Sequence, residues 1–246
     1  MMIDPDNWLY VLILVEGTTE ATFVDRVLVP HCAMLRIHLT PIVITTKRSQ
    51  TSAPNYKGGS PPYAKVQPQI KQLLNNSNAR QITTMIDFYG LEGKDFPGWS
   101  TLPIGSCYDQ VEHLEKHLSN EFSERFVPYF ALHEFEAMLF AEPEKFRNVF
   151  PRMANMQPRS KGKPQYISRL DQLIQELKEI KTQFDEAPET INSDYPPSKR
   201  ILSLIEGYRK VDDGVNIASE IGLAAIRREC PHFNVWLTQL EALAAP

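Results

Sequence analysis

The feature that most restricts the fold of this sequence is an apolar run at residues 8–15, which passes directly into a glycine turn and a helix. The run reads Trp-Leu-Tyr-Val-Leu-Ile-Leu-Val, the length and composition of a parallel strand covered on both faces. Glu16 and Gly17 follow it, and apolar residues then recur at helical spacing from Phe23 to Leu28. We therefore expect a strand, a tight turn and a helix in direct succession.

The start and the end of this first helix carry their own signals. Thr18 or Thr19 is expected to cap it, since a hydroxyl accepts a hydrogen bond from a free amide of the first turn. Pro30 is expected to close it, because proline interrupts a helix that has already begun.

Strands and helices alternate along the first part of the chain. Further strands are predicted at residues 41–46, 81–87 and 126–132, and helices at 64–75, 107–120 and from 133 onward. Beyond residue 150 the pattern is helical, at 167–184, 197–208, 215–229 and 233–243. The predicted fold is α/β: a mainly parallel, Rossmann-like sheet flanked by helices in residues 1–150, with a helical extension at 151–246 packing on it.

Composition limits the class of protein. The formal charge of −4 argues against a general nucleic-acid coating protein, although it does not exclude a nucleic-acid enzyme with an acidic site. Three distant cysteines give neither a disulfide framework nor a zinc signature, and a reducing cytoplasm fits them best. The run at residues 8–15 is too short to cross a membrane. We therefore expect a cytoplasmic protein with no membrane contact.

Acidic residues follow three of the predicted strands. Glu16 follows the first, Asp87 the third, and Glu134 and Glu136 the fourth. The carboxyl ends of parallel strands meet at one edge of a sheet, and oxygen ligands of this kind suit Mg²⁺ or Mn²⁺. The sequence therefore predicts a metal site for phosphodiester chemistry. The alternative is that each acid only stabilises a helix N-terminus.

Two motifs resemble those of Toprim domains. Residues 15–20, Val-Glu-Gly-Thr-Thr-Glu, look like the first Toprim motif, in which the glutamate is catalytic or metal-linked. Residues 85–90, Met-Ile-Asp-Phe-Tyr-Gly, resemble the second motif, an Asp-x-Asp at the end of a later strand. This resemblance implies a Toprim-like fold in which Glu16 and Asp87 are catalytic residues and metal ligands.

A more specific resemblance extends over nearly the whole chain, to a bacterial Toprim-like family of undefined function. Members of that family are similar to the Toprim half of overcoming-lysogenization-defect (OLD-type) nucleases. They are often encoded beside ABC- or SMC-like ATPases, in neighbourhoods linked to phage defence. The motifs that carry the resemblance are residues 84–91, 132–140, 197–200 and 221–223.

One departure from the Toprim pattern concerns metal binding. Tyr89 stands where the second aspartate of Asp-x-Asp is expected, and a phenol is a poor Mg²⁺ ligand at neutral pH. Either fewer metal ions are bound, or Glu134, Glu136 or Asp95 supplies the missing carboxylate. Glu134 is the first choice for this ligand. On a regular helix Glu134 and Glu136 would point about 200° apart, so Glu134 must sit at the cap of the helix if both residues bind metal.

Basic residues that could assist at phosphate lie in two places. Lys199 begins a predicted helix, whose N-terminus favours anions and which Ser198 could cap. The resemblance to OLD-type sites implies that Lys199 stabilises the transition state, whereas the alternative is a surface basic pair. Lys47, Arg48 and Lys57 on a long loop could follow a nucleic-acid backbone, or only be solvated. His133 is either a general base or a packing residue.

The leading hypothesis is a Mg²⁺- or Mn²⁺-dependent nuclease that acts on DNA or RNA with a separately encoded ATPase. The chain contains no GxxxxGK[ST] motif, so it is not expected to hydrolyse ATP itself. The alternatives are a binding or regulatory module that has lost its chemistry, which Tyr89 favours, and another phosphoryl- or nucleotidyl-transfer activity. A homo-oligomer is compatible with each of them.

Overall fold

The computed structural model describes residues 8–45, 61–91, 93–159, 167–184, 187–191 and 195–245. The basic loop with Lys47, Arg48 and Lys57 lies outside these residues. The chain divides into two compact units: unit 1 comprises residues 1–132 and 235–246, and unit 2 comprises residues 133–234. No helix among the described residues has the length and apolarity to cross a membrane.

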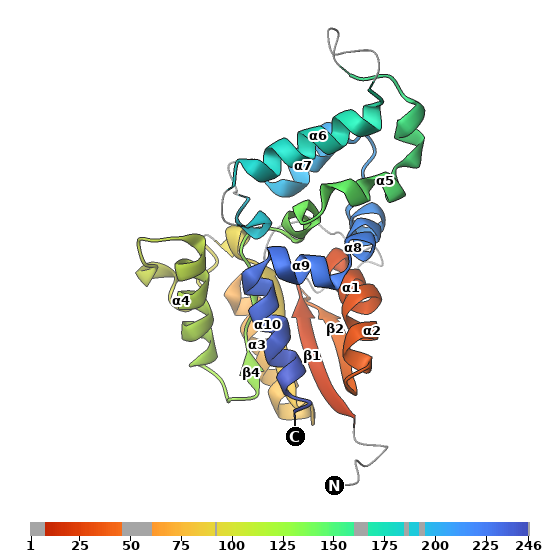
Figure 1. Cartoon of the computed structure of the whole chain (residues 1–246). Helices are drawn as coiled ribbons and strands as arrows, with labels where there is room; N and C mark the ends of the chain where they lie inside the picture. Colours follow the sequence, from red (N-terminus) through yellow and green to blue (C-terminus); the bar gives the residue numbers. More distant parts are fainter. Residues whose placement is uncertain are drawn as a thin grey trace, which may run out of the picture. The chain divides into compact units, whose positions relative to one another are not determined.

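Unit 1 is built on a parallel sheet (Figure 1). Its described strands are β1 (Leu9–Val15), β2 (Ile37–Val43), β3 (Gln81–Asp87), β4 (Phe126–Val127) and β5 (Phe130–Ala131). The order is β2-β1-β3-β4, with β5 also pairing with β3. Val15 lies opposite both Val43 and Met85, so β1, β2 and β3 end near the same edge of the sheet. The predicted parallel α/β fold is confirmed.

Helices cover both faces of this sheet. On one face Leu14 and Ile82 belong to a core shared with α3 and α4. On the other face Trp236 donates a hydrogen bond from Nε1 to Thr83 Oγ1 over 2.9 Å, which fixes α10 there. The helical segments of unit 1 are α1 (Thr18–Phe23), π-helical η1 (Val24–Leu28), α2 (Val29–Ala33), α3 (Tyr63–Asn76), 3-10 helices η2 (Phe88–Leu91) and η3 (Trp99–Thr101), α4 (Cys107–Ser119), and α10 (Pro231–Ala242) from Val235 onward.

The structure corrects two predictions at the first helix. Gly17, rather than Thr18 or Thr19, occupies the N-cap of α1, and no side chain caps this helix. Pro30 does not end the helical segment, because it lies in the first turn of α2, where the amide that proline lacks has no helical partner.

The second and fourth strands also differ from their predicted bounds. β2 begins at Ile37, four residues before the predicted start. The single strand predicted at 126–132 is instead β4 and β5, separated at Pro128, which has no amide to donate. Thr84 bridges the break, since its hydroxyl donates to the carbonyl of Tyr129 and accepts from the Tyr129 amide, each over 2.9 Å.

Unit 2 is helical, and the prediction of a helical C-terminal region is confirmed. A division of the domains at residue 150 stays a prediction. The described segments of this unit are η4 (Phe135–Phe140), η5 (Pro143–Lys145), α5 (Phe146–Val149), η6 (Pro151–Asn155), α6 (Arg169–Thr182), η7 (Pro188–Thr190), α7 (Pro197–Leu204), π-helical η8 (Lys210–Gly214), α8 (Val215–Ile221), α9 (Leu223–Glu229) and the first turn of α10. The helix predicted at 215–229 is interrupted at Gly222, whose φ of +79° favours glycine.

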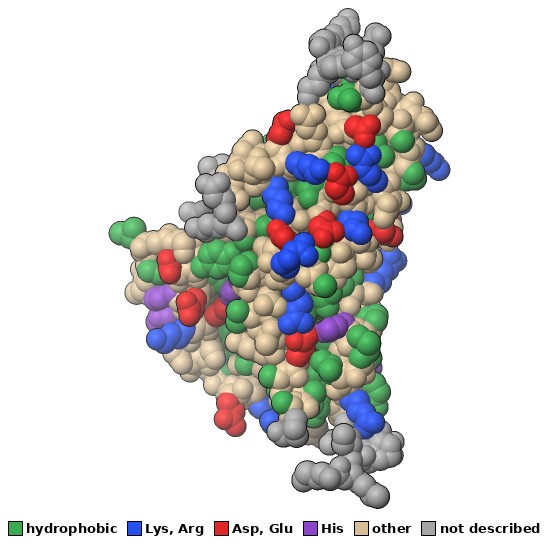
Figure 2. Space-filling model, in the orientation of Figure 1, with side chains coloured by type: hydrophobic (Ala, Val, Ile, Leu, Met, Phe, Trp, Pro, Cys, Tyr) green, Lys and Arg blue, Asp and Glu red, His purple; other side chains and the backbone are tan. Residues whose placement is uncertain are grey.

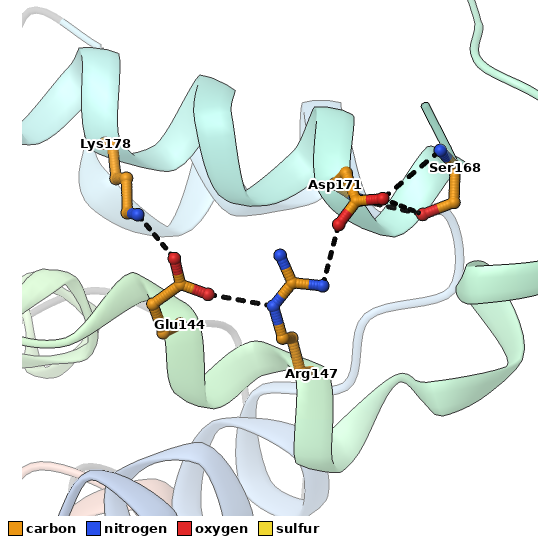
Figure 3. A network of polar contacts seen from close by, with 5 residues as sticks. All are labelled: Glu144, Arg147, Ser168, Asp171 and Lys178. Carbon is orange, nitrogen blue, oxygen red and sulfur yellow. Dashed lines mark hydrogen bonds and ion pairs between the residues drawn. The ribbon is translucent and has the colours of Figure 1, made fainter. Parts of the chain in front are cut away.

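A polar network ties α6 to the segment that contains η5 and α5 (Figure 3). Ser168 is the N-cap of α6 and forms a capping box with Asp171. The Asp171 carboxylate also accepts from Arg147 Nη1 over 2.8 Å. Glu144 accepts from Arg147 Nε over 2.8 Å and pairs with Lys178. Acidic and basic side chains are similarly intermixed on the helices of unit 2 that face the viewer in Figure 2. Among the described residues, this face therefore shows no broad patch of a single charge (Figure 2).

Candidate functional site

Two predicted site residues meet at the carboxyl end of the sheet in unit 1. Glu16 follows β1 and Asp87 ends β3, its neighbour. The backbone amide of Asp87 donates to Glu16 Oε2 over 3.4 Å, and the amide of Glu16 donates to the carbonyl of Met85 over 3.2 Å. Both acids are half-buried. The ends of β1 and β3 thus place these two acidic residues side by side, both partly accessible to solvent.

Glu20 lies close to this pair in the chain. Since α1 begins at Thr18, Glu20 falls in its first turn, where it is 9% exposed rather than solvated. A Cβ atom at Gly17 would lie 3.2 Å from Glu20 Oε2, which shows how closely the carboxylate approaches the turn. A side chain at Gly17 would therefore require a small shift of the Glu20 carboxylate.

The donors at this edge fit a hard divalent cation. Mg²⁺ is commonly held by one or two protein carboxylates while water or phosphate completes its octahedron. Glu16 and Asp87, at the ends of adjacent strands, are the residues that would provide such a pair. Within the described ranges, no three His, Cys, Asp or Glu side chains are arranged to hold a metal ion.

The predicted acids of unit 2 lie in a different environment. Glu134 is the N-cap of η4 and has an extended backbone, as the prediction for two metal-binding acids required. However, its carboxylate is 7% exposed and accepts from the backbone amide of Ser198 over 2.9 Å. The expectation that Ser198 caps α7 is wrong, because Pro196 is the N-cap. The anion at this helix N-terminus is Glu134 itself.

Glu136 is the more deeply buried of the two acids. It is 2% exposed, and Lys210 Nζ lies 3.1 Å from its Oε1. Burial raises the pKa of Glu136 to about 7, against the opposing charge of Lys210 and with a smaller contribution from Glu134. Near neutral pH its carboxyl group therefore exchanges between the neutral and the charged form.

Two further buried groups surround these acids. The Tyr208 hydroxyl and His133 Nδ1 have no hydrogen-bond partner in the part of the chain that the structure describes. Burial, followed by the charges of Glu136, Asp213 and Glu134, raises the pKa of Tyr208 well above its ordinary value. Burial lowers the pKa of His133 to about 4, although the charge of Glu134 opposes this shift. His133 is therefore neutral at physiological pH.

Lys210 and Tyr208 are the residues of this cluster that the sequence did not indicate. The sequence next to them indicates only a turn, at Gly207. No sequence pattern links them to Glu136, which lies far earlier in the chain. Lys199, the predicted cation, is exposed. The roles of Glu134, Glu136 and Lys199 in metal or phosphate binding stay predictions.

The sequence matches the family described as Domain of unknown function (DUF4276) over residues 15–241, so the chain belongs to this family. The resemblance seen in the sequence to a family of undefined function is confirmed. A search of the curated proteins finds no match.

Two solved structures resemble the chain distantly. The C-terminal region of the Burkholderia pseudomallei OLD protein has 16% identity and a TM-score of 0.42, over 97% of this chain and all of that one. The C-terminal region of the Xanthomonas campestris pv. campestris OLD protein has 14% identity and a TM-score of 0.36, over 93% and 96% of the two chains.

Proposed function

We propose that this member of the DUF4276 family is a Mg²⁺- or Mn²⁺-dependent enzyme that hydrolyses phosphodiester bonds in nucleic acid. The observation that carries the proposal is the pairing of Glu16 and Asp87 at the ends of adjacent parallel strands, where ligands of open α/β sheets bind. The Toprim-like motifs in which both residues lie support the same reading.

The protein residues have defined tasks in this proposal. Glu16 and Asp87 would hold the ion, and the Asp87 amide, which donates to Glu16 Oε2, would orient the Glu16 carboxylate. The ion would supply the positive charge that draws a phosphodiester to an acidic edge and favours attack by water. Both acids are only half-buried, so solvent reaches them, and hydrolysis requires water.

The proposal includes a separate ATPase partner. The chain has no P-loop of its own, and the family that it resembles is often encoded beside ABC- or SMC-like ATPases. We expect the cleavage activity to depend on such a partner in the cell, in a role connected with phage defence.

The test is metal binding and cleavage by the purified full chain. Mn²⁺ binding by calorimetry should weaken at least tenfold in Asp87→Asn, because one of two charged ligands is lost. Degradation of DNA or RNA in Mn²⁺ should fall by more than about 100-fold, since losing an essential ligand costs several kcal/mol of transition-state stabilisation. Asp25→Asn, an exposed acid on η1, is the matched control and should behave as wild type. Asp87→Asn with wild-type activity would refute the proposal.

A second candidate is a binding or regulatory module without catalysis. Tyr89 in place of a second aspartate favours this candidate. Calorimetry and the cleavage assay together separate the two. Metal binding with cleavage supports the enzyme, whereas no binding at millimolar Mg²⁺ or Mn²⁺, or binding without cleavage of any nucleic acid, supports the module.

A further inference from the structure

Two histidines lie side by side on α4 of unit 1. His113 and His117 are four residues apart, so they occupy the same face of the helix on successive turns. Their ring centroids are 4.3 Å apart, and the ring planes are inclined at 46° to each other. His113 is half-buried and His117 is exposed. Solvent therefore reaches a pair of imidazole rings that the helix already holds together.

The turn that carries η3 contacts both rings. A Cβ atom added at Gly98 would lie 2.8 Å from Cγ of His117, so the backbone of this turn lies directly against that ring. The φ of +85° at Gly98 also favours glycine. At the other end of the turn, Thr101 Oγ1 lies 3.1 Å from Nε2 of His113. Residues 98–101 thus position both histidines.

The hydrogen bonds of Thr101 select one tautomer of His113. The Thr101 hydroxyl donates its single proton to the carbonyl of Gly98 over 3.2 Å, because a carbonyl can only accept. The hydroxyl oxygen therefore accepts from His113, whose proton lies on Nε2. The lone pair of the neutral ring is then on Nδ1, the nitrogen that a metal ion can bind. A hydroxyl that fixes the ring in this way has the role of an outer partner in a metal site.

We propose that His113 and His117 bind a Zn²⁺ ion, at a site separate from the Mg²⁺ or Mn²⁺ site at Glu16 and Asp87. Imidazole nitrogen suits Zn²⁺, whereas Mg²⁺ takes oxygen ligands. Two histidines at i and i+4 of a helix are a known zinc-binding pair. Two nitrogens on one tetrahedral Zn²⁺ lie about 3.3 Å apart. Rings with centroids 4.3 Å apart reach this separation by rotation of the side chains.

The chain supplies part of the coordination shell. No group of three His, Cys, Asp or Glu suited to a metal ion occurs among the described residues, so water completes the shell. In the zinc peptidase motif HExxH a glutamate follows the first histidine, but here that residue is Leu114, which is buried in the core. The next residue, Glu115, accepts from the amide of Phe130 over 2.8 Å. The pair is therefore a binding site for metal and not a peptidase centre.

The experiment is calorimetric titration of the full chain with Zn²⁺ in the presence of millimolar Mg²⁺. His117→Gln should weaken Zn²⁺ binding by at least about tenfold, since even outer partners of a metal ligand are worth this much. His113→Gln should do the same. Glutamine is a good helix former, so α4 is retained, and circular dichroism checks this. His38→Gln removes an exposed histidine of β2 that lies beside Tyr10 and should leave binding unchanged.

Two further variants test the details of the site. Thr101→Val, which removes the hydroxyl beside His113, should weaken Zn²⁺ binding by less than His117→Gln does. Asp87→Asn should leave Zn²⁺ binding unchanged, because the carboxylate edge is a separate site. Loss of nuclease activity in Asp87→Asn with intact Zn²⁺ binding would support both proposals.

Three results would overturn the inference. The first is that the wild type binds no Zn²⁺. The second is equal affinity of the wild type and the double variant His113→Gln/His117→Gln. The third is an equal loss of binding in His38→Gln or Asp87→Asn, which would place the ion elsewhere. A protein that cleaves no nucleic acid in Mn²⁺ but binds Zn²⁺ through His113 and His117 would refute the proposed function alone.

Discussion

Glu16 and Asp87 in unit 1, and Glu134 and Glu136 in unit 2, are acids that follow apolar segments, yet the two pairs differ in environment. The first pair is half-buried at the carboxyl end of a parallel sheet. The second pair is at most 7% exposed, and each of its members has a partner inside the unit. Glu134 accepts from the amide of Ser198, and Glu136 forms an ion pair with Lys210.

This difference shows how a protein can use one residue type in two ways. A deeply buried carboxylate needs compensation from the protein, because charge is costly away from water. A half-buried pair stays within reach of solvent, from which a cation can enter. Unit 2 acids should therefore affect stability, and unit 1 acids should affect ligand binding.

The largest expected effect is that of Glu136→Gln, and it depends on pH. The pKa of Glu136 rises from an unfolded value of 4.5 to about 7, so the folded state binds more protons between these values. The wild type therefore loses stability as pH rises through this window, by roughly 3 kcal/mol, and the amide variant does not. Urea unfolding followed by circular dichroism should show that the free energy of unfolding of the variant rises relative to that of the wild type as the pH increases to about 8.

His133→Gln is the control of opposite sign. The folded pKa of His133 is about 4, below its unfolded value of 6.5, so the wild type gains stability as pH rises between them. The free energy of unfolding of this variant should therefore rise relative to that of the wild type as the pH falls. If the difference between Glu136→Gln and wild type is the same at every pH, the deep burial of that carboxyl group is wrong.

A smaller effect is expected from Glu134→Gln. The amide still accepts from the Ser198 amide but loses its charge at the N-terminus of α7, at a cost of about 1 kcal/mol. The measurement is made at about pH 5, where Glu136 is mostly protonated. At this pH Glu134 is not repelled by a charged Glu136, so the substitution gains no stability by removing such a repulsion. Hydrogen exchange of the first turn of α7 should quicken. Lys199→Gln, at an exposed position of the same turn, should leave exchange unchanged.

The smallest effect on stability is expected from Asp87→Asn without metal. A half-buried carboxylate near a second one should change the free energy of unfolding by less than about 0.5 kcal/mol when neutralised. Tryptophan fluorescence reports on this unit, because Trp8, Trp99 and Trp236 all belong to it. A loss of several kcal/mol in the absence of metal would assign Asp87 a structural role and erase the contrast between the units.

The elements that the sequence placed well are those whose pattern is local. Residues 81–87 form β3 exactly as predicted, and α3 and α4 lie within a residue of their expected bounds. Ser106 forms a capping box at the start of α4, so the signal for this helix lies within its own first turn. The meeting of Glu16 and Asp87 also followed from the sequence, because parallel strands end at a common edge.

The sequence by itself determined the parallel α/β core and the place of its strand-end acids, because apolar period and strand polarity are encoded locally. Only tertiary structure decided that Glu134 would cap α7 and that Lys210 would reach the buried Glu136. It also decided that Tyr89, among several aromatic neighbours, would remain exposed. These outcomes depend on which distant segments pack together and on how much water they exclude. The spacing of residues along the sequence determines neither of these.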